Sequence, residues 1–144
     1  MRIYLDNCCF NRPFDDQSQL RIRLECEAKL KIQEDIRSGL HQLIWSYILD
    51  YENSKNPFQE RVEQIARWRA YSEVDIEEDA EIVDIATQVS QYGVKKMDSL
   101  HLACAIKAKA DYFLTTDDEI MKKDILIQGI RIIDPIGFIK EVLL

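Results

Sequence analysis

Short apolar runs alternate along the chain with longer segments in which apolar residues recur every three or four positions. The runs are typical of buried strands and cover residues 2–5, 40–45, 74–76, 112–115 and 130–133. The periodic segments between them predict helices. Strands that alternate with helices favour an α/β fold, with a central, mainly parallel sheet of four to five short strands flanked by helices.

Helix boundaries follow from capping residues and from prolines. The expected helices cover residues 14–37, 46–54, 56–71, 79–91 and 98–109, with a short helix after 117 and a terminal one from 135. Apolar residues at a spacing of four predict the buried face of the first helix: Leu20, Leu24, Ala28, Ile32 and Ile36. Three expected helices begin with a capping side chain, from Ser46, Asp79 or Asp98. Two more place Pro57 and Pro135 at the favoured first position.

Composition, charge and cysteine spacing limit the classes of protein to which this chain can belong. The length of 144 residues fits one domain over 1–144. The net charge of -7 argues against simple electrostatic binding of nucleic acid, although carboxylates that hold divalent cations also add negative charge. Four cysteines without Cys-x-x-Cys spacing indicate a reduced, cytoplasmic protein with no structural zinc. No signal sequence or membrane-spanning run is expected.

Four carboxylates stand where predicted strands end or helices begin. Asp6 follows the first strand, and Asp117 follows the strand over 112–115. Asp98 opens the most apolar helix, and Glu52 lies in the helix after the second strand. Each alone could be a cap or a solvated charge, but such positions can converge at one edge of a parallel sheet. Clustered carboxylates suit Mg²⁺ or Mn²⁺, and one or two such ions could hold a phosphate and activate water.

Three motifs carry a resemblance to a known family. The first runs from Ile3 to Asp6-Asn7, and the second from Ser46 to Glu52. The third is the stretch Asp98-Ser-Leu-His-Leu-Ala-Cys-Ala, which leads into Thr-Thr-Asp at residues 115–117. Over essentially its whole length the chain resembles PIN-domain proteins, and most closely the VapC-type toxins of prokaryotic toxin–antitoxin systems.

The resemblance implies a single PIN-like domain and a ribonuclease. It implies that Asp6, Glu52, Asp98 and Asp117 bind Mg²⁺ or Mn²⁺ and cleave single-stranded RNA. It also implies a homodimer and an antitoxin partner. The unusual leader over residues 8–13 indicates a divergent branch of the family.

Several positions depart from the family pattern or leave alternatives. Asn7 stands where Thr or Ser is frequent, and it can still hydrogen-bond a water or a neighbouring carboxylate. The second motif lacks the usual Glu-Leu-Arg-like continuation, so Asp50 rivals Glu52 as the second acid, while Asp118 could supplement Asp117. Ser46 is expected to support the acids. The residues that could touch substrate are Arg12, Lys96 and His101.

Two other classes of function fit the sequence to different degrees. A PIN-fold binding or regulatory protein without catalysis would fit the departures near Asn7 and Asp50. A phosphoacceptor domain would require an adjacent acidic pair after the first strand. Only the single Asp6 stands there, so the sequence argues against this class.

Overall fold

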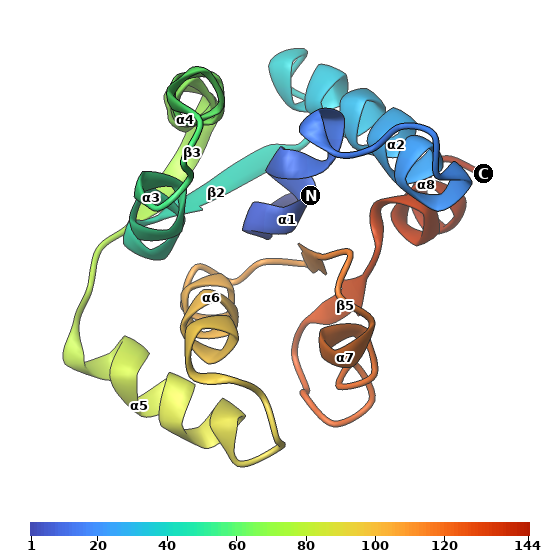
Figure 1. Cartoon of the computed structure of the whole chain (residues 1–144). Coiled ribbons are helices and arrows are strands. Elements are labelled where there is room, and N and C mark those ends of the chain that lie inside the picture. Colours follow the sequence, from blue (N-terminus) through green and yellow to red (C-terminus); the bar gives the residue numbers. More distant parts are fainter.

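The computed structural model describes residues 1–144 and is built around a five-stranded sheet (Figure 1). The strands are β1 (Arg2–Leu5), β2 (Gln42–Ser46), β3 (Ser72–Ile76), β4 (Tyr112–Leu114) and β5 (Arg131–Ile133). Their order is β3-β2-β1-β4-β5, and every neighbouring pair is parallel. The predicted α/β fold with a parallel sheet is therefore confirmed.

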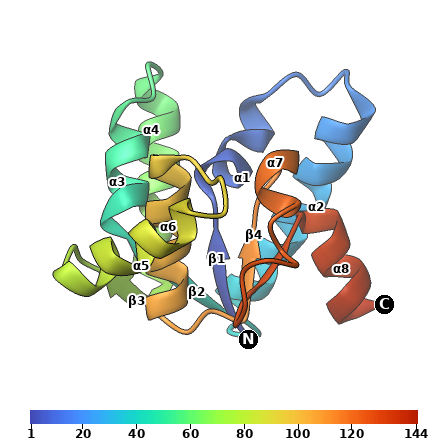
Figure 2. The ribbon, with the colours of Figure 1, turned by 90° about the horizontal axis from the view of Figure 1, so that it is seen from below.

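Eight α-helices surround the sheet. They are α1 (Asn7–Asn11), α2 (Leu20–Arg37), α3 (Tyr47–Ser54), α4 (Gln59–Ala66), α5 (Ala80–Ser90), α6 (Lys96–Lys107), α7 (Asp118–Met121) and α8 (Pro135–Leu143). Single 3-10 turns cover Arg12–Phe14 and Arg67–Tyr71. Figures 1 and 2 show α2 beside α8 on one side of the sheet and α5 beside α6 on the other. None of these helices is both long and apolar enough to traverse a lipid bilayer.

The central strand explains where a site can form. In β1, Ile3, Tyr4 and Leu5 are fully buried, because helices cover both faces of the sheet. The chain order reverses beside β1, with β2 and β3 on one side and β4 and β5 on the other. In such sheets a crevice opens beyond the carboxyl ends of the strands at the point of reversal. The residues that follow β1 and β4 therefore lie at this crevice.

The first predicted helix is wrong at its start, and its predicted buried face is confirmed at Ile32 and Ile36 but wrong at Leu20 and Leu24. Helix α2 begins at Leu20 rather than at residue 14, and a short helix, α1, occupies the segment after Asp6, which caps it. Leu20 is exposed, and the buried positions of α2 include Glu25 and Lys29. The buried Glu25 has a partner in Arg12, which donates a hydrogen bond to its carboxylate at 3.1 Å.

Of the other predicted helix starts, some are confirmed and some are wrong. Ser46 and Asp79 cap their helices as predicted, and Pro135 is the first residue of α8. Pro57 instead lies outside α4, which begins at Gln59. Helix α6 begins at Lys96, so Asp98 lies in its first turn rather than at the cap. The Asp98 carboxylate is consequently not used for capping.

Candidate functional site

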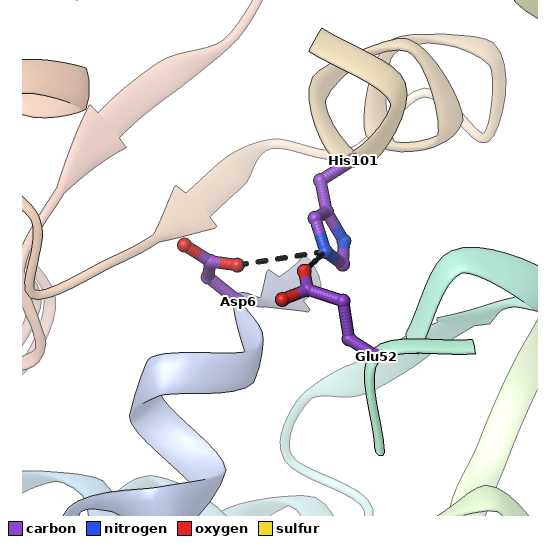
Figure 3. Close-up of side chains that lie close together, drawn as sticks. All are labelled: Asp6, Glu52 and His101. Atoms are coloured by element: carbon purple, nitrogen blue, oxygen red, sulfur yellow. Dashed lines mark hydrogen bonds and ion pairs between the residues drawn. The ribbon is translucent and has the colours of Figure 1, made fainter. Parts of the chain in front are cut away.

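Three side chains from distant parts of the sequence meet beyond the end of β1 (Figure 3). Asp6 follows β1, Glu52 comes from α3 and His101 comes from α6. Their ligand atoms all lie within 4.8 Å of one another. The Nε2 atom of His101 bonds the Glu52 carboxylate and lies 3.9 Å from Oδ1 of Asp6. This trio is the innermost part of the candidate site.

Asp6 is held in place by Asn7, the first residue of α1, and by Thr115, which directly follows β4. Its Oδ2 accepts a hydrogen bond from the Thr115 hydroxyl at 2.9 Å, and its Oδ1 accepts one from the Asn7 backbone N–H at 2.8 Å. The Thr115 hydroxyl oxygen in turn accepts a bond from the Asp117 N–H at 3.1 Å. Thr115 thereby joins the end of β4 to the end of β1, and the Asp6 side chain is only 8% exposed.

Asp98 and Asp117 line an adjoining cleft of about 290 Å³. Lys95 and Lys123 line the same cleft, and neither lysine forms an ion pair there. The cleft therefore presents carboxylates and free ammonium groups together. Such a surface can meet both a divalent cation and a phosphate.

The pKa of Asp98 depends on its burial and on the charges of the other predicted acids. Burial, together with the negative charges of Asp6, Asp117 and Glu52, raises this pKa to about 6. Only His101 acts in the opposite direction. Asp6 and Glu52 meet His101 in the trio, and Asp98 and Asp117 line the cleft; a joint role of the four acids stays a prediction.

His101 is fully buried and links the acids to the core. Its Nδ1 lies 2.6 Å from the Tyr4 hydroxyl, which lies 2.7 Å from the Ser46 hydroxyl. A carboxylate only accepts hydrogen bonds, so Nε2 carries the proton toward Glu52, and Nδ1 accepts one from Tyr4. The Ser46 hydroxyl donates to Tyr4, and its oxygen accepts from the Leu49 N–H at 3.2 Å. His101, Tyr4 and Ser46 therefore each have a partner for their hydrogen-bonding groups.

The donor set fits a divalent cation. None of the four carboxylates forms an ion pair with a lysine or arginine, and the buried Asn7 Oδ1 has no hydrogen-bond partner. Carboxylate oxygens are the preferred ligands of Mg²⁺ and Mn²⁺. A cation would offset their repulsion, while both ring nitrogens of His101 stay in hydrogen bonds, one to Glu52 and one to Tyr4.

The structure places the rival acids elsewhere. Asp50 accepts a hydrogen bond from the Trp45 indole at 2.9 Å and lies 3.6 Å from Arg69. Asp118 is held by Arg21 at 2.8 Å. Both are thus paired with groups outside the trio, and their metal-binding roles stay predictions without structural support.

The three residues predicted to touch substrate lie in different parts of the structure. Arg12 pairs with Asp15 at 2.8 Å and with Glu25 at 3.1 Å. Lys96 lines a different depression, between α5 and α6, whereas its neighbour Lys95 lines the cleft. The sequence contains no signal for a role of Lys123, because this residue follows the short helix α7 and belongs to none of the three motifs. His101 alone lies at the acids.

The raised pKa of Asp98 predicts how the stability of the metal-free protein changes with pH. A folded pKa of about 6, against 3.8 for the ordinary group, means that the folded chain holds a proton which the unfolded chain has lost. The free energy of unfolding of the metal-free protein should therefore fall as pH rises from 4 to 6. With allowance for solvent screening, we expect Asp98→Asn to raise it by about 1–2 kcal/mol at pH 7.

Chemical unfolding at pH 4 and pH 7 without metal measures this effect. Asp84→Asn is the matched control, because Asp84 is exposed on α5 and has no bonded partner. Added Mn²⁺ should stabilise the wild type more than the Asp98→Asn variant. An equal gain from Asp98→Asn at both pH values would contradict a repulsive cluster.

Known proteins share the family pattern and the fold of this chain. The sequence pattern of the PIN domain matches residues 3–126, whereas no protein of curated function matches the sequence. Two similar solved structures are VapBC2 from Rickettsia felis bound to a DNA fragment from their promoter, at 15% identity, and FitAcB from Neisseria gonorrhoeae, at 13%. In each case the TM-score is 0.55, over 92% of this chain and 97% of the other. At these identities the two structures establish a shared fold, and the sequence match establishes that the chain belongs to the PIN domain family.

Proposed function

We propose that this protein is a metal-dependent endoribonuclease that hydrolyses phosphodiester bonds in single-stranded RNA. The proposal is carried by the meeting of Asp6 and Glu52 with His101 beyond the end of β1, and it is supported by the cleft that Asp98 and Asp117 line. Membership of a family whose members are generally nucleases supports it.

The carboxylates supply the chemistry through a cation. Asp6, Glu52, Asp98 and Asp117 would hold one or two Mg²⁺ or Mn²⁺ ions, which when bound polarise a phosphate and lower the pKa of a water molecule. His101 keeps the Glu52 carboxylate oriented toward Asp6. No protein side chain is required as the nucleophile.

The lysines of the cleft complete the site. Lys95 and Lys123 stand at the wall of the cleft that Asp98 and Asp117 line. The chain has a net charge of -7, so general attraction cannot bring RNA to it. These two ammonium groups are instead local contacts for the backbone phosphates of the RNA strand.

The proposal extends to partners. The resemblance to VapC-type toxins and the two similar solved structures support a role as the toxin of a toxin–antitoxin pair, held inactive by an antitoxin. A homodimer and a cytoplasmic location belong to the same proposal. The four free cysteines fit a reducing compartment.

Cleavage assays test the activity directly. The purified chain is incubated with labelled single-stranded RNA in Mn²⁺, in Mg²⁺ and in EDTA. We expect cleavage with either metal and none in EDTA. Asp6→Asn and Asp98→Asn should both abolish cleavage while leaving the thermal transition cooperative, because neither replacement removes a side chain from the apolar core.

Asp84→Asn again serves as the control and should cleave as the wild type does. Undiminished cleavage by Asp6→Asn and Asp98→Asn would exclude this site. If the wild type cleaves no single-stranded RNA and calorimetry detects only weak Mn²⁺ binding, the chain is a PIN-fold binding or regulatory protein without catalysis.

A further inference from the structure

A second pocket lies between α2 and α4 and shares no residue with the cleft of Asp98 and Asp117. Its volume is about 220 Å³. Aromatic side chains form much of its wall, including Phe10 from α1, Phe14 from the first 3-10 turn and Trp68 from the second. Pockets for drug-sized ligands are usually larger, roughly 300–1,000 Å³, so this one suits a ligand of about ten non-hydrogen atoms.

The polar groups of this pocket lack partners. Lys29 is 4% exposed, and its ammonium forms no hydrogen bond or ion pair, only a cation–π contact with Phe10 at 5.6 Å. Gln33, one turn along α2, is also 4% exposed, and its buried amide nitrogen has no partner. A donor that is buried without an acceptor is costly, so the Gln33 amide and the neighbouring Lys29 ammonium favour a ligand that supplies acceptor atoms.

Arg37 adds a second cation to the same pocket. Its guanidinium lies over the Trp68 ring at 4.6 Å from the centroid and forms no ion pair. No acidic residue lines the pocket, although acidic residues outnumber basic ones by 26 to 19 in the chain. The sequence spacing of Lys29, Gln33 and Arg37 puts all three on one face of α2.

The lowered pKa of Lys29 shows that its ammonium is poorly stabilised where it lies. Burial, with a smaller contribution from Arg37, lowers the pKa of its ammonium to about 8, although Cys9 and Cys26 act in the opposite direction. A buried ammonium without an anion is unfavourable. An anion bound beside Lys29 would remove this penalty.

We infer that this pocket binds a small organic anion whose carboxylate pairs with Lys29 and Arg37 and whose apolar part rests against Phe10, Phe14 and Trp68. A carboxylate suits the pocket better than a phosphate does, because a single negative charge costs less to remove from water. Charge-assisted bonds from Lys29 and Arg37 hold the carboxylate. The acid is either a free small molecule or the side chain of a polypeptide.

Calorimetric titration with two probes tests the inference and separates the two sources. Phenylacetate represents a free acid, and an acetylated, amidated Glu-Phe dipeptide represents a polypeptide side chain. We expect at least one probe to bind the wild type with a Kd of about 1 mM or below. Tighter binding of phenylacetate assigns the free acid, and tighter binding of the dipeptide assigns the side chain.

Two controls make the result specific to the pocket. Lys29→Met should weaken binding at least about tenfold, whereas Lys140→Met, which removes an exposed and unpaired charge on α8, should not change it. Phenylacetamide, which has nearly the same shape without the charge, should not bind measurably.

The Lys29→Met variant is expected to fold, because it replaces an unpaired buried charge with an apolar side chain of similar length. A thermal transition at or above that of the wild type verifies this. Absence of binding by both probes, or equal binding by Lys29→Met and the wild type, would overturn the inference. Neither result bears on RNA cleavage, since Lys29 lies outside the cleft.

Discussion

Replacing Glu52 by glutamine is expected to reduce the rate of RNA cleavage roughly a hundredfold or more, equivalent to at least about 2.7 kcal/mol of activation free energy. The amide oxygen of glutamine can still accept the bond from His101 Nε2, so the local structure should persist. The replacement removes a negative charge that lies within 4.8 Å of the side-chain atoms of Asp6 and His101. The loss is therefore one of metal binding.

Asp50→Asn is the matched control, because the two acids are close in sequence but differ in surroundings. The Asp50 carboxylate accepts from Trp45, and an asparagine oxygen can do the same. Its exposed pair with Arg69 contributes little. Initial cleavage rates with Mn²⁺ should therefore stay within about twofold of the wild type. The reverse pattern of losses would make Asp50 the second acid.

Tyr4→Phe should weaken Mn²⁺ binding by about 10–100-fold, although Tyr4 itself contacts no candidate ligand oxygen. The change removes the hydroxyl that donates to His101 and accepts from Ser46. It keeps the ring stacked on Phe113, with centroids 5.3 Å apart. His101 then loses the bond that fixes its tautomer, and Glu52 loses its orientation.

The same replacement should also lower the free energy of unfolding by about 1–3 kcal/mol, because it strands polar groups of His101 and Ser46 in the core. Tyr47→Phe is the matched control, since the buried Tyr47 hydroxyl has no partner and its loss should be neutral or slightly stabilising. Calorimetry with Mn²⁺ and chemical unfolding measure the two effects. Unchanged Mn²⁺ affinity in Tyr4→Phe would show that the chain of hydrogen bonds does not support the site.

Local chemistry explains why much of the fold could be predicted. A strand buried on both faces must be apolar throughout, and β1 shows this at Ile3, Tyr4 and Leu5. Helix starts at Ser46, Asp79 and Pro135 depend on groups a few residues away, so short patterns suffice.

The failures involve interactions across the chain. No local pattern predicts that α2 buries Glu25 and Lys29 in place of Leu20 and Leu24, because the partner of Glu25 is Arg12, which lies outside the helix. The start of α2 was misplaced for a related reason. The segment after Asp6 forms its own helix, α1, with Asp6 as the cap.

The sequence by itself determined the alternation of strands and helices and the placement of Asp6, Asp98 and Asp117 at or beside their ends, because both follow from neighbouring residues. Only the tertiary structure decided that Glu52 rather than Asp50 faces Asp6, and that His101 joins them. Those contacts link residues 49 and 97 positions apart, in the pairs Glu52–His101 and Tyr4–His101. Contacts of that range depend on how the sheet and helices pack, which no short stretch of sequence encodes.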